Sequence, residues 1–236
     1  MVDNPIEFDE NIRERLRAVP LFAQLEDEDL DRLAGLSRVL QLDKKQMLFN
    51  EGEPYRGMFV ILSGLAVVYK LGNDGRMLIL QVCRPGDPLA EVPLFEEADA
   101  GYPAYGKVTR AGDVLFLPRE QFVPFLKQHP EVAWEMLDVF AARIKELGLQ
   151  LEGVTLREVT SRLARYLMRE IEAAGRHDES SPVLTLPLAK GSLASYLGMV
   201  HETLSRTFSR LVRDEIVSVK GSQITILDLD RLKRLQ

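Results

Sequence analysis

The feature that most constrains this chain is a pair of helical patterns near its C-terminus, separated by a short turn that contains glycine. Residues 188–196 and 200–213 carry apolar side chains at helical spacing, and Leu197-Gly-Met199 stands between them. A tight bend between helices needs a residue that tolerates a positive φ, and glycine does so without steric cost. Two helices joined by such a turn form a helix-turn-helix. The sequence therefore predicts this motif in the last third of the chain.

Short β-rich runs lie on either side of the two helices. Residues 183–187 suggest a strand before them, and residues 216–220 and 223–227 suggest two strands after them, joined by a turn that contains glycine. Such a pair reads as a hairpin, or wing. A further helix is expected over residues 157–174. Together these elements predict a winged helix-turn-helix domain.

The N-terminal part of the second helix is predicted to face DNA. In a helix-turn-helix the N-terminal residues of the second helix reach base edges in the major groove. Glu202, Ser205 and Arg206 are spaced i, i+3 and i+4 and share one helical face, with His201 just before them. Arginine pairs with guanine, glutamate accepts from cytosine N4, and serine can contact either kind of base. An ordinary ion pair between Glu202 and Arg206 is the alternative, and the neighbouring turn and wing favour DNA reading.

Charge is divided unevenly along the chain. The whole chain has a formal net charge of −6, whereas residues 157–236 carry 13 Lys and Arg against 10 Asp and Glu. Positive charge near the helix-turn-helix suits contacts with DNA phosphates, which Lys and Arg neutralise. Four basic residues are the predicted phosphate contacts: Lys190, Arg210, Arg213 and Lys220.

Residues 46–117 have a different sequence pattern from the C-terminal third. Short β-rich runs alternate with turn signals, and Asn73-Asp-Gly75 between Tyr69 and Met77 is the clearest hairpin signal. Several short strands at this spacing predict an antiparallel roll. A helix is expected before the roll over residues 23–40, where leucines recur at spacings of three to five. The fold class is therefore α+β.

A long helical pattern follows Pro130. Its apolar residues step alternately by three and four, as in the heptad seam of a coiled coil: Leu137, Phe140, Ile144, Leu147, Leu151 and Val154. The seam predicts a homodimer in which two copies of this helix pair. Because it covers little more than two heptads, packing of the seam on the chain's own β-domain stays open as an alternative. Gly153-Val-Thr155 suggests a hinge before the next helix.

By its motifs the chain resembles the CRP/FNR family of bacterial transcription regulators over nearly its whole length. The stretches that carry the resemblance are Leu48-Phe-Asn-Glu-Gly-Glu53, Val60-Ile-Leu-Ser-Gly64, Gly75-Arg76, Pro85-Gly-Asp87, Pro93-Leu-Phe95, Leu186-Pro-Leu188 and Leu197-Gly-Met-Val-His-Glu-Thr-Leu-Ser-Arg206. The resemblance implies three parts. They are an effector-sensing β-roll like a cyclic-nucleotide-binding jelly roll at 1–130, a dimerisation helix and hinge at 131–156, and a winged helix-turn-helix at 157–236.

The likeness extends to the residues that would read DNA. Glu202, Ser205 and Arg206 match the reading residues of the FNR-type branch, while His201 stands where cAMP-type members carry arginine. The resemblance implies a palindromic site in double-stranded DNA with half-sites close to TTGA and TCAA. It also implies RNA polymerase as a partner.

An effector pocket between the roll and the long helix is also implied by the resemblance. Its expected residues are Gly86, Asp87, Glu91, Val92, Gly101, Tyr102, Leu137 and Phe140. Glu91 matches the carboxylate that contacts the ribose in cyclic-nucleotide binders. Gly101 and Tyr102, however, stand where those proteins carry the phosphate-neutralising arginine and a neighbouring Ser or Thr. Because a buried phosphate without a cation is costly, the sequence argues against cAMP or cGMP and favours a capping or packing role for Glu91.

The identity of the effector stays unknown at this stage. Cys83 is the single cysteine, so the cysteine cluster of oxygen-sensing members is missing, and neither an iron-sulfur cluster nor another metal site is expected. Some similar regulators sense nitric oxide through haem, and the Tyr102-Pro-Ala-Tyr105 segment keeps haem open as an alternative. Candidate axial ligands are His129, His177, His201, Cys83, the methionines and the tyrosines.

Other classes of protein have little support. No Ser/His/Asp set, metal-ligand spacing or phosphate loop stands out, so the chain is not expected to be an enzyme. No apolar run approaches the roughly 18 residues of a membrane span, and the N-terminus lacks a signal-peptide pattern, so a cytoplasmic protein without membrane contact is expected. The competing hypothesis is a cyclic-nucleotide-binding module that regulates a protein partner through its C-terminal region.

Overall fold

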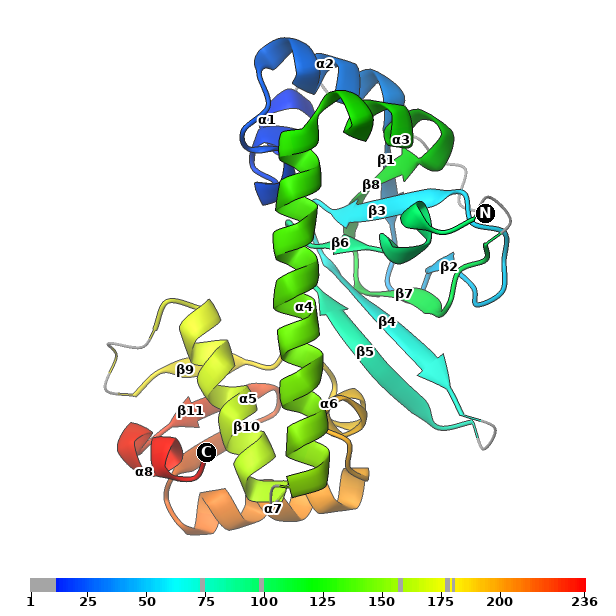
Figure 1. The fold of residues 1–236 in the computed structure, drawn as a ribbon. Coiled ribbons are helices and arrows are strands. Elements are labelled where there is room, and N and C mark those ends of the chain that lie inside the picture. The colour runs from blue at the N-terminus through cyan, green and yellow to red at the C-terminus, as the bar shows by residue number, and fades with distance from the viewer. Residues whose placement is uncertain (1–11, 73–74, 98–99, 157–158, 177–178, 180) are drawn as a thin grey trace. The chain divides into compact units, whose positions relative to one another are not determined.

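The computed structural model describes residues 12–236 except 73–74, 98–99, 157–158, 177–178 and 180, and within its longest helix the side chains of 146 and 149–156 also lie outside the description. Contacts divide the chain into two compact units, Met1–Arg143 and Ile144–Gln236. The boundary falls within helix α4, Pro130–Leu156 (Figure 1). Within the described residues no helix is both long and apolar enough to cross a membrane.

Two four-stranded antiparallel sheets form the roll of the N-terminal unit, as predicted. One sheet has the order β1-β8-β3-β6 and the other the order β2-β7-β4-β5. The strands are β1 (Arg38–Leu42), β2 (Met47–Phe49), β3 (Gly57–Ile61), β4 (Leu65–Leu71), β5 (Met77–Cys83), β6 (Pro88–Leu89), β7 (Tyr105–Arg110) and β8 (Gly112–Pro118). All five residues of β3 are buried, because this strand lies inside its sheet between β8 and β6.

The predicted hairpin is present. β4 pairs with β5 in antiparallel register, with Tyr69 opposite Ile79 and Ala66 opposite Cys83. Gly75 at the connection has φ +75°, the conformation that a tight turn requires. Residues 73–74 of the predicted turn lie outside the described residues.

Helical segments precede and follow the strands of the roll in the sequence, and one short segment, η2 (Val92–Phe95), lies between β6 and β7. The single helix expected over residues 23–40 is wrong: α2 ends at Leu36, and Leu40 lies in β1, opposite Val114 of β8. Leucines four residues apart fit a helix, but here the backbone turns extended at Ser37 and pairs with a distant strand. The helical segments of this unit are α1 (Ile12–Arg17), η1 (Pro20–Phe22), α2 (Asp27–Leu36), η2 (Val92–Phe95), α3 (Arg119–Gln128) and the start of α4.

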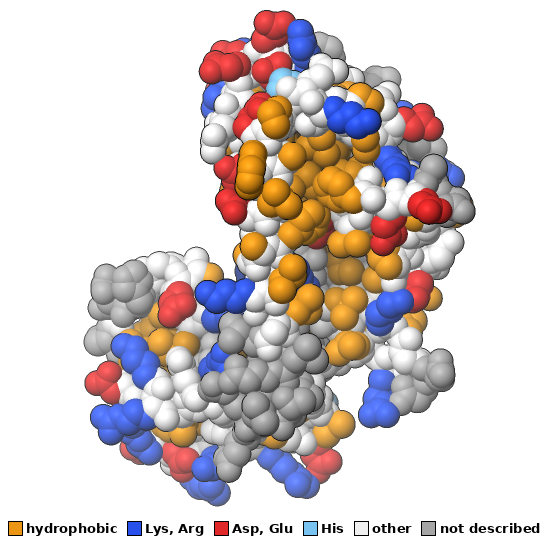
Figure 2. All heavy atoms as spheres, in the orientation of Figure 1, with side chains coloured by type: hydrophobic (Ala, Val, Ile, Leu, Met, Phe, Trp, Pro, Cys, Tyr) orange, Lys and Arg blue, Asp and Glu red, His pale blue; other side chains and the backbone are white. Residues whose placement is uncertain are grey.

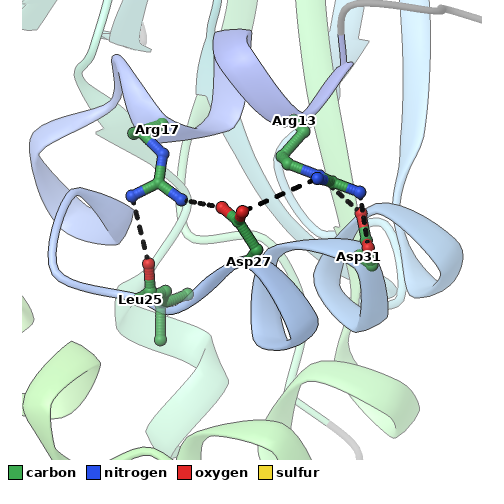
Figure 3. A network of polar contacts seen from close by, with 5 residues as sticks. All are labelled: Arg13, Arg17, Leu25, Asp27 and Asp31. Atoms are coloured by element: carbon green, nitrogen blue, oxygen red, sulfur yellow. Dashed lines mark hydrogen bonds and ion pairs between the residues drawn. The ribbon is translucent and has the colours of Figure 1, made fainter.

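A polar network holds α1 against α2 (Figure 3). Arg13 donates to Asp31 through two nitrogens, at 2.8 and 2.6 Å, and its Nη1 lies 3.8 Å from Asp27. Arg17 bridges Asp27 and the carbonyl of Leu25. These side chains are half exposed, so each pair adds little stability. The network fixes how α1 lies on α2 more than it stabilises the unit.

The C-terminal unit is a winged helix-turn-helix, as predicted. The two helices of the motif, α6 and α7, are followed by the antiparallel hairpin of β10 and β11, and β9 adds a third strand beside β11. Its elements are α5 (Val159–Ala173), β9 (Val183–Thr185), α6 (Lys190–Tyr196), α7 (His201–Arg213), β10 (Val217–Lys220), β11 (Gln223–Ile226) and α8 (Leu229–Arg234). The backbone stays helical through 153–155, where the sequence suggests a hinge, because glycine lowers helix propensity without by itself ending a helix.

Candidate nucleic-acid interface and effector region

The turn between α6 and α7 is built around Gly198. This residue has φ +63°, which an L-residue with a side chain rarely adopts. The N–H of Met199 donates to Ala194 O at 3.0 Å, and the N–H of Gly198 donates to Ser195 O at 3.1 Å. This arrangement is the usual glycine-terminated end of a helix, and it satisfies the last carbonyls of α6.

Arg162 of α5 holds the same turn from outside. Its Nη1 donates to Leu197 O at 2.7 Å and to Gly198 O at 3.0 Å. Burial lowers the pKa of this guanidinium. Arg162 is not among the residues that the sequence predicts for this site, because its contacts are formed with residues about 35 positions away and follow no local pattern.

The first two turns of α7 present the predicted base-reading residues to solvent. His201, Glu202, Ser205 and Arg206 are all exposed. Arg206 Nη2 donates to Glu202 Oε1 at 2.5 Å, and the two side chains are 79% and 73% exposed. The ion pair that the sequence offered as an alternative is therefore present in the structure. A pair this exposed is weak and leaves both groups accessible to a ligand.

The opposite face of α7 fixes the helix in the unit. Leu204, Thr207, Phe208 and Leu211 are buried there, against α5, α6 and β10. Thr207 donates to the carbonyl of Thr203 at 2.8 Å, so its hydroxyl is satisfied within the helix. The division into a buried apolar face and an exposed polar face orients the reading residues outward.

The predicted phosphate contacts lie around this surface. Arg210 and Arg213 are exposed near the end of α7, and both lie within 4 Å of the Asp214 carboxylate, at 3.9 and 3.8 Å. Lys190 begins α6, and its Nζ lies 5.7 Å from the centre of the Phe208 ring. Lys220 is exposed at the tip of the β10–β11 hairpin.

The predicted dimerisation seam is divided between two environments. Leu137, Ile144 and Leu147 of α4 are exposed by 52%, 71% and 38%. Phe140 instead packs on the core of the chain's own roll and meets Phe95 edge to face at 5.8 Å. Leu151 and Val154 have side chains outside the described residues. Figure 2 shows hydrophobic side chains gathered on one face of the N-terminal unit. Trp134, also on α4, is 69% exposed.

Gly101 and Tyr102, which stand where cyclic-nucleotide binders carry the phosphate anchor, both pack inside the N-terminal unit. Gly101 lies against backbone, so that a Cβ there would come within 3.2 Å of Glu53 O. Tyr102 is buried, donates to Gly57 O at 2.9 Å and stacks on Phe49 with ring centres 4.5 Å apart. Burial raises the pKa of the Tyr102 phenol. Neither residue supplies a cation.

Glu91, a predicted pocket residue, is buried. Burial raises the pKa of its carboxyl, and the charge of Arg143 on α4 opposes this shift. Arg143 also donates to the carbonyl of Leu80. This places Glu91 in the packed interior of the N-terminal unit.

The remaining predicted pocket residues do not share one environment. Gly86 and Asp87 form a turn in which Gly86 N donates to Ile61 O at 2.8 Å and Asp87 accepts from Arg84 N at 2.8 Å. Val92 is 51% exposed in η2. A cavity of about 980 Å³ does exist in the roll, and of the eight predicted residues Tyr102 alone lines it.

The candidate haem ligands are differently placed. His129 is buried, stacks on Phe125 and has its nitrogens 3.0 Å from Glu131 and 3.5 Å from Asp29. His201 is exposed on α7, and His177 lies outside the described residues. Cys83 is fully buried, and burial raises the pKa of its thiol well above the ordinary value. Among the described residues no three His, Cys, Asp or Glu side chains form a group that could hold a metal ion.

Comparisons with known proteins match both units. Residues 161–235 match the Crp-like helix-turn-helix domain, and residues 39–129 match the cyclic nucleotide-binding domain. The chain is 27% identical to the probable transcriptional regulator flp of Lacticaseibacillus casei, over 91% of this chain and 94% of that protein. It is also 27% identical to the transcriptional activatory protein AadR of Rhodopseudomonas palustris, over 93% and 90%.

Solved structures give the same assignment of the fold. The structure of FixK2 from Bradyrhizobium japonicum superposes with a TM-score of 0.72 at 21% identity, covering 85% of this chain and 97% of that one. Both domain matches and the full-length relatives agree with the geometry of the helix-turn-helix. The chain therefore belongs to the CRP/FNR family of transcription regulators.

Proposed function

We propose that this DNA-binding regulator acts as a homodimer and reads a palindromic operator with half-sites close to TTGA and TCAA. The observation that carries the proposal is the exposed face of Glu202, Ser205 and Arg206 on the first two turns of α7. α7 is the second helix of the motif, which enters the major groove in proteins of this architecture. The exposed face therefore suits direct contact with base edges.

Each residue has a distinct expected role. Arg206 pairs with guanine O6 and N7, Glu202 accepts from cytosine N4, and Ser205 and His201 contact neighbouring bases. Lys190, Arg210, Arg213 and Lys220 hold phosphates, which gives affinity without sequence preference. Arg210 and Arg213 would exchange Asp214 for phosphate oxygens on binding.

The dimer is supported by the exposed side chains of α4. Leu137, Ile144 and Leu147 present apolar surface that a second copy of the helix would bury, and Leu151 and Val154 continue the seam in the sequence. Dimers of this motif present two recognition helices about 34 Å apart, one turn of DNA. A symmetric operator follows from that spacing.

The N-terminal roll is proposed as the effector domain, with residues 1–130 as sensor, 131–156 as dimerisation helix and hinge, and 157–236 as DNA-binding domain. A cyclic nucleotide does not suit it, because Gly101 and Tyr102 provide no partner for a cyclic phosphate. Effector binding would shift the equilibrium between states of different DNA affinity. RNA polymerase in the cytoplasm is the expected partner at the promoter.

The direct test is fluorescence anisotropy with a labelled duplex that carries TTGA and TCAA half-sites and a scrambled duplex of equal length. Specific recognition predicts at least about tenfold tighter binding to the palindrome at one fixed salt concentration. Equal affinity for both duplexes, with and without haem supplied during purification, would reject the proposal. A titration with cAMP in the same buffer separates the competing nucleotide-binding module, which predicts tight nucleotide binding and no DNA complex.

A further inference from the structure

The N-terminal roll contains a cavity that has no part in the proposed recognition of DNA. Its volume is about 980 Å³, at the upper end of the range of small-molecule sites. Its walls come from β1, β2, β3, β8, the segment before β3 and the first half of α3. These elements lie within the N-terminal unit, so the cavity is complete in one chain.

Five aromatic side chains form a continuous inner wall of the cavity. They are in contact in the order Tyr55, Tyr102, Phe49, Phe59 and Phe116, with successive ring centres 5.1, 4.5, 5.7 and 5.0 Å apart. All five line the cavity, and the first four are at most 7% exposed. Both phenols are already satisfied, since Tyr55 donates to Ala90 O and Tyr102 to Gly57 O. The aromatic wall therefore offers an apolar surface rather than hydrogen-bonding groups.

Charged side chains form the rim of the same cavity: Arg38, Glu53, Arg56, Arg119 and Glu120. Three guanidinium groups against two carboxylates leave an excess of one positive charge. Glu53 is tied to Asn50, which donates to it from its backbone and its side chain at 3.0 and 2.9 Å and holds its pKa below the usual value.

Arg38 is the rim cation best placed to meet a ligand. Arg119 already donates to the carbonyls of Glu96 and Glu97. Arg38 is exposed at the start of β1, and its side chain makes no hydrogen bond or ion pair within the described part of the chain. An added anion would thus gain a partner without displacing one.

We propose that this cavity binds an amphipathic monocarboxylate, whose apolar body lies against the aromatic wall and whose carboxylate meets the arginines of the rim. One carboxylate matches the single excess charge, and an alkyl or aryl body matches the walls. The site is separate from the predicted nucleotide region, with which it shares Tyr102 alone. The inference does not rest on operator recognition, and its test contains no DNA.

Dodecanoate, below its micelle concentration, is a suitable probe for isothermal titration calorimetry with the full chain. Dodecan-1-ol and dodecyltrimethylammonium have the same chain with no charge and with a positive charge. We expect one dodecanoate per chain, bound at least about fivefold more tightly than the alcohol and more tightly still than the cation. No binding of dodecanoate, or equal affinity for all three compounds, would overturn the proposal.

Two pairs of variants locate the site. Val123→Trp fills the cavity from α3, whereas Gln121→Trp adds the same ring on exposed α3 surface outside it. Arg38→Gln removes the rim cation, whereas Arg110→Gln removes an exposed arginine elsewhere on the roll. We expect Val123→Trp to weaken dodecanoate binding by about tenfold or more, and Arg38→Gln by about fivefold with no change for the alcohol.

The controls decide the outcome. If Gln121→Trp or Arg110→Gln weakens binding as much as its partner variant, the fatty acid binds elsewhere and the assignment is wrong. Near-ultraviolet circular dichroism checks that each variant is folded. Should Val123→Trp fail to fold, Leu40→Phe fills the same cavity from β1, and unchanged dodecanoate binding in that variant would also overturn the proposal.

Discussion

Arg206 donates a hydrogen bond to the carboxylate of Glu202, one turn earlier on α7, at 2.5 Å. Exposed i,i+4 pairs of this kind contribute about 0.3–0.5 kcal/mol in a helix. Opening the pair therefore loses little free energy compared with what two base contacts provide. Under the proposed function, both side chains would leave this pair to contact base edges.

Replacing Arg206 with alanine is expected to weaken binding to the palindromic duplex by about 1–3 kcal/mol and to relax the preference at one base position. The measurement is anisotropy with a set of duplexes in which each half-site position carries all four base pairs. Arg213→Ala is the matched control, because Arg213 is expected to hold a phosphate and its removal should weaken binding to all duplexes similarly. If Arg206→Ala also weakened all duplexes equally, its role as a base reader would be wrong.

Removing the Arg162 side chain is expected to loosen the turn that positions α7. The two carbonyls of Leu197 and Gly198 would lose a charged donor, which corresponds to about 1–2 kcal/mol of local stability. Hydrogen exchange of peptides covering α6 and α7 measures this loss, and DNA affinity should fall with it. Arg165→Ala on the same helix is the control, since the Arg165 side chain makes no hydrogen bond within the described residues. Unchanged exchange in Arg162→Ala would contradict the prediction.

An acidic residue on the exposed seam of α4 should separate the proposed dimer. Ile144→Glu would place two carboxylates in an apolar contact, so the dimer dissociation constant is expected to rise at least about tenfold. Sedimentation velocity over a range of concentrations measures it. Ala142→Glu adds the same charge on another exposed face of α4 and should leave the constant unchanged. Equal behaviour of the two variants would exclude this seam as the interface.

The buried carboxyl of Glu91 predicts a pH dependence of stability. Because burial raises its pKa in the folded chain above the usual value of 4.5, ionisation favours the unfolded chain as pH rises above that value. Glu91→Gln removes this penalty and keeps the shape. Its urea midpoint should exceed that of the unmodified chain at pH 7, and the difference should shrink as pH falls toward 4.5. A difference that is independent of pH would mean that packing, rather than charge, is responsible.

Local patterns predicted the C-terminal unit well. The turn glycine at 198, the apolar face of α7 and the two wing strands are each encoded by residues that are close together in the sequence, so local spacing specified each of them. The helix expected over 23–40 was too long because a strand distant in the sequence determines where the helix must end. Leu40 belongs to β1 because β8 pairs with it from more than 70 residues away, and a sequence window cannot include that partner.

The same limit applies to the sites in the roll. The cavity is lined by residues from Arg38 to Pro124, which no short motif brings together. The sequence did identify Gly101 and Tyr102 as replacements of a phosphate anchor. It could not reveal that the Tyr102 ring turns inward, because that orientation depends on the carbonyl of Gly57 and the ring of Phe49, which come from other strands.

Because its thiol is buried, the reactivity of Cys83 can measure how often the roll opens. Cys83 ends β5 opposite Ala66, is fully covered, and burial raises its thiol pKa, so the reactive thiolate is scarce in the folded chain. A thiol reagent can therefore label the protein only during excursions in which β5 leaves its sheet. The labelling rate without denaturant measures how often this opening occurs. A ligand that stabilises the closed roll should lower the labelling rate.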